Sequence, residues 1–160
     1  MEILVKSRYY FEMLRGTLDE SRLFERIRVI SVNSVRVPEE PPFSRQYWDA
    51  ANVLILRFDD VEGNEIEAQY GQLMSDSDAE AIARFAEVED PRPIMVHCTA
   101  GISRSGAIGA CLNEYYNKKR TLNEDEHAAF WTWHRNINPN LHVMKLLWKR
   151  LDLGGLKWQI

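Results

Sequence analysis

Residues 97–105 read His97-Cys98-Thr99-Ala100-Gly101-Ile102-Ser103-Arg104-Ser105. An apolar run at 94–96 leads into this stretch, and residues 105–110 can start a helix behind it. A strand, a tight loop and a helix N-terminus in this order form an anion-binding site, because the loop amides point inward and the helix dipole favours negative charge. A cysteine at the mouth of such a site should exist largely as thiolate. The stretch therefore predicts a nucleophile aimed at a bound anion.

Two side chains of this stretch carry the predicted chemistry. Cys98 is the candidate nucleophile, which would attack phosphorus in line with the leaving oxygen. Arg104 supplies a planar fork that can hold two oxygens of one phosphate, and Gly101 permits close backbone approach. The remaining donors are expected from the backbone amides of Thr99, Ala100, Gly101, Ile102, Ser103 and Arg104. A buried structural cysteine is the alternative for Cys98, and the arginine six positions later argues against it.

The order His-Cys-x-x-Gly-x-x-Arg-Ser resembles the signature loop of the cysteine-based protein tyrosine phosphatases. The pattern is met at His97, Cys98, Gly101, Arg104 and Ser105, and it is most similar to the small dual-specificity type. The resemblance implies a two-step hydrolysis through a cysteinyl-phosphate, without metal or cofactor. It also implies that the Ser105 hydroxyl hydrogen-bonds the cysteine sulfur and helps it leave. His97 is expected to support the loop rather than to carry protons, because its side chain should point away from the ligand.

A general acid is needed because an alkoxide is a poor leaving group. The resemblance implies an aspartate from a loop upstream of the cysteine, and Asp59 and Asp60 follow an apolar run there. Side chains alternate along an extended chain, so only one of the two can easily face the cleft. We predict Asp60, with Asp59 as the alternative. Asn138 and Asn140 are weaker candidates, on a late loop of the kind that can line the pocket in the resembled family.

Strands and helices alternate through the middle of the chain. Strands are predicted at 2–5, 27–32, 53–56 and 94–97, and helices at 9–14, 75–88, 104–117, 122–134 and 141–153. A capping box, formed either by Ser75 with Asp78 or by Ser77 with Glu80, should start the second of these helices. The fold class predicted is α/β, with a mostly parallel central sheet of about four to five strands flanked by helices. Residues 1–160 are expected to form a single domain.

Composition restricts the class of protein further. Of the 160 residues, 45% are hydrophobic and 28% charged, which is typical of a soluble globular chain. The net charge of −4 argues against nucleic-acid binding, and no apolar run is long enough to span a bilayer. Two cysteines cannot build a disulfide framework, so a cytoplasmic location is expected. The protein is also expected to be a monomer. Cys111 is expected in the core, with a protective disulfide to Cys98 as the alternative.

These observations favour a phosphatase that acts on phosphotyrosine in proteins or peptides, with phosphoserine and phosphothreonine as further candidate substrates. One alternative is a module that recognises phosphate without turning it over, although nucleophile, arginine and acid are all present. RNA 5′-phosphatase and phosphoinositide phosphatase activities use the same chemistry. The negative net charge disfavours the first, and the absence of lysine between Cys98 and Arg104 disfavours the second.

Overall fold

The strand that ends at the signature loop, β4 (Ile94–Cys98), lies inside the central sheet of the computed structural model, which describes residues 1–63 and 69–155. The strand order is β1-β4-β2-β3, and all the pairings are parallel. Ser7 of β1 lies opposite Cys98, and Ser31 of β2 lies opposite His97. All carboxyl ends therefore meet at one edge of the sheet, where open α/β folds bind ligands. This architecture confirms the predicted α/β class.

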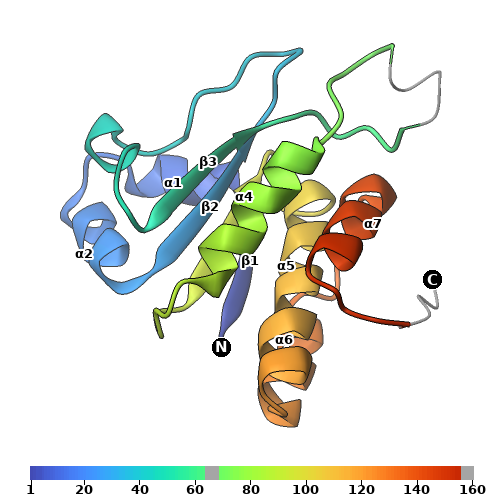
Figure 1. The fold of residues 1–160 in the computed structure, drawn as a ribbon. Coiled ribbons are helices and arrows are strands. Elements are labelled where there is room, and N and C mark those ends of the chain that lie inside the picture. Colours follow the sequence, from blue (N-terminus) through green and yellow to red (C-terminus); the bar gives the residue numbers. More distant parts are fainter. Residues whose placement is uncertain (64–68, 156–160) are drawn as a thin grey trace.

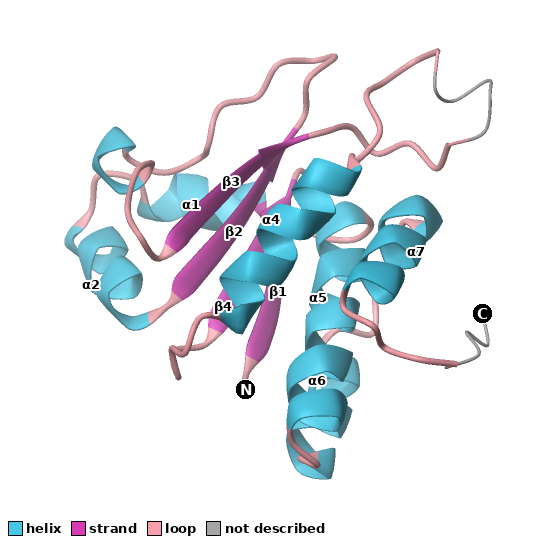
Figure 2. Ribbon diagram, viewed as in Figure 1, coloured by secondary structure: helices cyan, strands magenta, loops and turns pink. Residues whose placement is uncertain are grey.

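Helical segments separate the four strands along the chain, and further helices follow the last strand (Figure 2). The other strands are β1 (Ile3–Ser7), β2 (Arg28–Asn33) and β3 (Val53–Arg57). The α-helices are α1 (Arg8–Leu14), α2 (Leu18–Arg26), α4 (Asp76–Glu87), α5 (Arg104–Glu114), α6 (Glu124–Trp133) and α7 (Leu141–Arg150). A 3-10 turn, η1 (Arg45–Tyr47), precedes β3, and a π-helical segment, η2 (Tyr115–Arg120), continues α5.

Helices cover both faces of the sheet (Figure 1). One face packs with α4, α5 and α7 in the larger core cluster, which includes Val96 and Cys98. The other face packs against α1 and α2 in a smaller cluster around Phe11 and Met95. Successive β4 side chains alternate between these two layers, as the pleat of a strand requires. No helix within the described residues has the length and apolar character needed to cross a membrane.

Helix α2 is the main element that the sequence analysis did not predict. Thr17 accepts a hydrogen bond from the amide of Glu20 and so caps the N-terminus of α2. That Thr-x-x-Glu pattern was the available signal. For α4 the structure decides between the two capping boxes, because Ser75 and Asp78 each accept a bond from the other's amide.

Candidate active site

Cys98 is the last residue of β4, and its side chain is buried on the face shared with α5. Its Sγ lies 3.0 Å from the hydroxyl oxygen of Ser105, in the first turn of α5. The backbone amide of Gly101 donates to the same sulfur at 3.3 Å. A hydroxyl and a backbone amide therefore contact the sulfur.

The loop after Cys98 closes tightly because of Gly101. This residue has φ +74°, a left-handed conformation that glycine adopts without strain. A Cβ atom there would lie 2.6 Å from the carbonyl carbon of Lys6 and from the amide nitrogen of Ser7. The loop thus packs directly on the backbone at the end of β1, and only a glycine fits.

Arg104 begins α5, and its guanidinium is almost fully buried. Its Nη1 donates to the Ser34 hydroxyl at 2.9 Å and to the Phe58 carbonyl at 2.8 Å. Its Nη2 donates to the Thr99 hydroxyl at 2.9 Å. Its Nε is buried with no hydrogen-bond partner among the described residues. An unpaired buried donor costs free energy, and here it belongs to a cation whose side chain lines the pocket with Cys98.

Glu39 is a site residue that the sequence analysis missed. It lies on the loop after β2, and both of its carboxylate oxygens accept from the Thr99 hydroxyl, at 2.9 and 3.0 Å. The Ser34 amide donates to it at 2.8 Å, and Arg8 forms an ion pair with it at 3.3 Å. Burial alone would raise the pKa of Glu39, but the Ser34 and Thr99 hydrogen bonds and the charge of Arg8 outweigh burial and lower it. Glu39 thereby fixes the hydroxyl that holds Arg104.

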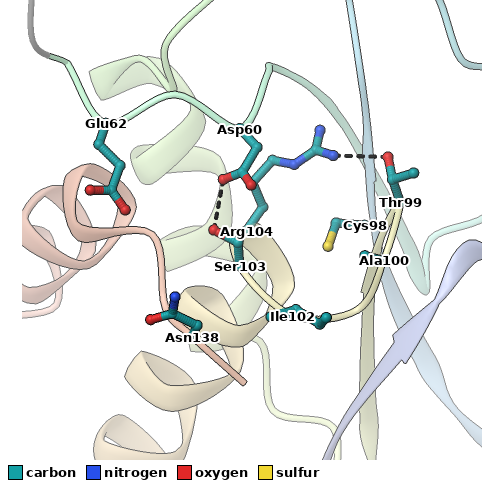
Figure 3. Close-up of a pocket in the computed structure, with 9 residues that line it drawn as sticks. All are labelled: Asp60, Glu62, Cys98, Thr99, Ala100, Ile102, Ser103, Arg104 and Asn138. Carbon is teal, nitrogen blue, oxygen red and sulfur yellow. Dashed lines mark hydrogen bonds between the residues drawn. The ribbon is translucent and has the colours of Figure 1, made fainter. Parts of the chain in front are cut away.

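The two adjacent aspartates have different environments. Asp60 is exposed and lines a pocket of about 450 Å³ together with Cys98 and Arg104 (Figure 3). Its Oδ1 accepts from the Ser103 hydroxyl at 2.7 Å and from Asn140 Nδ2 at 2.9 Å. Its Oδ2 has no hydrogen-bond partner among the described residues, so this oxygen is available to carry a proton.

Asp59, in contrast, is buried and does not line that pocket. Its carboxylate accepts from the backbone amides of Val35, Arg36 and Gln72. Burial would raise the pKa of Asp59, but these three bonds and the charge of Arg104 overcome that effect and lower it. Asp59 therefore ties the loops after β2 and β3 together as a carboxylate.

The loop between α6 and α7 contributes both of the weaker candidates. Asn138 lines the pocket, and its backbone amide donates to the Ile102 carbonyl at 3.0 Å. Asn140 is fully buried; its Oδ1 caps α7 by accepting from the Val143 amide, while its Nδ2 reaches Asp60. One side chain thus couples the start of α7 to the candidate acid.

His97 points to the opposite face of the sheet from Cys98 and packs against the rings of Phe11 and Phe43. Its Nδ1 lies 3.1 Å from the Cys98 carbonyl, and its Nε2 lies 2.6 Å from the Ser31 hydroxyl. Burial lowers the pKa of His97 to about 4, so the ring is neutral at pH 7. A carbonyl only accepts, so Nδ1 carries the proton and Nε2 accepts from Ser31. The ring therefore orients the backbone at Cys98, and it faces away from the pocket.

Cys111 lies deep in the larger core cluster, where its sulfur is 3.6 Å from that of Met144 on α7. Burial, followed by the nearby charge of Glu114, raises the pKa of this thiol, and both cysteines are free. The other histidines make structural contacts; His134, for example, accepts from the Val5 amide at 3.0 Å. Within the described residues, no group of three or more His, Cys, Asp or Glu side chains could hold a metal ion.

Comparison with known proteins agrees with this geometry. The human tyrosine phosphatase-like serine/threonine/tyrosine-interacting protein covers 94% of this chain and 91% of its own, at 17% identity and a TM-score of 0.56. The active form of Tk-PTP covers 95% and 92%, at 15% identity and a TM-score of 0.52. PTPMT1 in complex with PI(5)P covers 94% and 90%, at 16% identity and a TM-score of 0.51. The fold is that of the protein tyrosine phosphatases.

A sequence relative supports the same resemblance over a shorter stretch. It is 34% identical over 55 residues and is named "Putative tyrosine-protein phosphatase AMV078", from Amsacta moorei entomopoxvirus. The match covers 34% of this chain and 32% of the relative, about a third of each. No family model matches the chain. The resemblance to phosphatases of the tyrosine and dual-specificity type is thus confirmed in fold, and in sequence over this stretch.

Proposed function

We propose that this protein is a metal-independent phosphatase that removes phosphate from phosphotyrosine in proteins. The observation that carries the proposal is the meeting of Cys98, Arg104 and Asp60 in one pocket. Ser105 lies in contact with the sulfur on its buried side. A nucleophile, an anion-binding cation and a proton donor are the three groups that this hydrolysis requires.

The first step transfers the phosphoryl group to the enzyme. The Cys98 thiolate forms an S–P bond while the P–O bond to the substrate breaks, and protonated Asp60 gives its proton to the leaving oxygen. The donors for the equatorial oxygens are the unpaired Nε of Arg104 and the loop amides. The loop between Cys98 and α5 supplies these amides, and the dipole at the N-terminus of α5 adds to the attraction.

The second step releases phosphate. A water molecule attacks phosphorus, its proton passes to the Asp60 carboxylate, and the S–P bond breaks. The electron pair returns to the Cys98 sulfur. The Ser105 hydroxyl, 3.0 Å away, donates to the thiolate as it forms and so makes it a better leaving group.

The lining of the pocket favours phosphorylated protein over a polyphosphorylated lipid headgroup. Arg104 is the one cation among its lining residues, and Asp60 and Glu62 place two carboxyl groups at the same opening. Additional phosphates on an inositol ring would meet these carboxyl groups at close range. The pocket is open to solvent and bordered by Ile102, which is 40% exposed. We include phosphoserine and phosphothreonine as further substrates on this ground.

The test is hydrolysis of p-nitrophenyl phosphate by the purified protein in excess EDTA, followed by a substrate panel. The panel comprises phosphotyrosine and phosphothreonine peptides, phosphatidylinositol phosphates in vesicles and 5′-phosphorylated RNA. We expect activity with EDTA and the highest kcat/KM for the phosphotyrosine peptide. Strict dependence on added metal would reject the mechanism, and a preference for lipid or RNA would reject the substrate class. Phosphopeptide binding without turnover would favour a recognition module.

A further inference from the structure

A second groove, away from the candidate active site, lies between the edge strand β1 and helix α6. It encloses about 400 Å³ and includes Trp133 and Phe130 of α6, Ile3 and the carboxylates of Glu2 and Glu126. None of the residues that line it also lines the pocket of Cys98. The groove thus combines an apolar base with two acidic groups.

Trp133 is the unusual feature of this surface, because 80% of its area is exposed. A tryptophan usually buries most of its large apolar surface, and exposed tryptophans are enriched where partners bind. Its indole has no hydrogen-bond partner among the described residues. The face of a tryptophan ring is also the best aromatic surface for a cation.

The two glutamates are unpaired within the part of the chain that the structure describes. Glu2 is exposed and Glu126 is half-buried, and both line the groove. His134, the remaining titratable group of the lining, has its pKa lowered by burial, and its Nε2 accepts from the Val5 amide. No lysine or arginine lines the groove. The lining therefore carries negative charge, and Lys6, whose charge acts on His134, is not among the lining residues.

The backbone of β1 adds a second means of recognition. The Glu2 carbonyl accepts from β4, whereas the Val5 amide points outward to His134. Ile3 is two residues before Val5, so its backbone N–H and C=O also point away from β4, at the edge of the sheet. An added peptide strand could pair with these two groups.

We propose that this groove binds an extended basic peptide segment of a partner protein. An arginine or lysine side chain would stack on Trp133 and pair with Glu2 and Glu126, while the peptide backbone lies along Ile3. Charge complementarity selects this occupant, because the lining presents carboxylates and an aromatic face and contains no cation. The proposal is independent of the phosphatase chemistry, since the groove shares no lining residue with the pocket of Cys98.

The probe is a synthetic hexapeptide of alternating arginine and valine, titrated into the full chain and followed by amide NMR and calorimetry. We expect saturable shifts confined to β1, α6 and the Trp133 indole, and binding that weakens as salt rises. The matched control peptide carries glutamate in place of arginine and should not bind.

Three variants test the assignment. Trp133→Ala should weaken binding about tenfold, and Glu126→Gln about two- to fivefold. Glu124→Gln changes the same helix turn outside the groove lining and should leave the affinity unchanged. All three should hydrolyse p-nitrophenyl phosphate at the wild-type rate, if the proposed function holds.

Several results would overturn the proposal. They are no binding at millimolar peptide, equal affinity for the glutamate peptide, an affinity unaffected by Trp133→Ala, or shifts centred on the loop after Cys98. The last experiment measures the self-association of the chain alone by sedimentation. Self-association that Trp133→Ala abolishes would assign the groove to a second copy of this chain instead.

Discussion

Asp59 and Asp60 are adjacent in sequence, and their different hydrogen bonds predict different consequences of substitution. Asp60→Asn removes the proposed proton donor and should lower kcat about 10²- to 10⁴-fold for alkyl or aryl esters with poor leaving groups. The loss should be much smaller for p-nitrophenyl phosphate, whose leaving oxygen needs little protonation. The measurement is the dependence of kcat on leaving-group pKa. The same slope in the variant and the wild type would remove Asp60 from this role.

Asp59→Asn is the matched control for that experiment. The substitution replaces a carboxylate that accepts three backbone bonds, so it should lower the free energy of unfolding by about 1–3 kcal/mol. The slope against leaving-group pKa should not change. A steeper slope in Asp59→Asn, together with an unchanged slope in Asp60→Asn, would instead assign the role of proton donor to Asp59.

His97 gives a prediction about pH. Burial lowers its pKa from 6.5 in the unfolded chain to about 4 in the folded protein. Between these values the unfolded state binds more protons, so stability is complete above pH 6.5 and falls as pH drops toward 4, by roughly 3 kcal/mol. Urea unfolding between pH 7.5 and 5 should show about 2 kcal/mol of this loss. NMR should find the His97 ring neutral at pH 6, with its proton on Nδ1. A ring that protonates near pH 6.5 would contradict the account.

At the scale of elements, the contact between the signature loop and the end of β1 depends on Gly101. Gly101→Ala adds a Cβ that meets backbone atoms of Lys6 and Ser7 at 2.6 Å, and it also forces alanine into φ +74°. Gly16→Ala is the matched control, because φ there is +76° and nothing lies within 4 Å. The control should cost about 1 kcal/mol of unfolding free energy. Gly101→Ala should cost more and should also reduce kcat/KM, and equal effects of the two substitutions would contradict the close contact.

The elements themselves were largely predictable from local patterns. The apolar run at 53–56 and the strand before His97 are found as β3 and β4, and the helix that starts behind the loop is found as α5. Helix α2 was missed because few of its positions are apolar, although the Thr17 cap was visible in the sequence. The helix predicted over 104–117 is found as α5, which ends at Glu114, and the π-helical segment η2, which continues to Arg120.

At the scale of the whole molecule, the candidate site joins segments that are far apart in sequence. The sequence was sufficient to propose Cys98 and Arg104, because both belong to the signature loop. It was also sufficient to propose Asp60, because this residue follows a recognisable strand. Glu39 and Ser34 could not be proposed, because they belong to an irregular loop whose path is fixed by tertiary contacts. Local patterns carry no information about which distant carboxylate the fold brings to Thr99.

The central claim is that Cys98 carries the phosphoryl group during turnover. The most direct measurement is rapid acid quenching of the protein during hydrolysis of a phosphotyrosine peptide, followed by mass spectrometry of the fragment that contains residues 97–105. We expect one phosphoryl group on Cys98 and none in Cys98→Ser, which should bind substrate without turnover. Steady hydrolysis with no phosphorylated Cys98, or activity retained in Cys98→Ser, would contradict it.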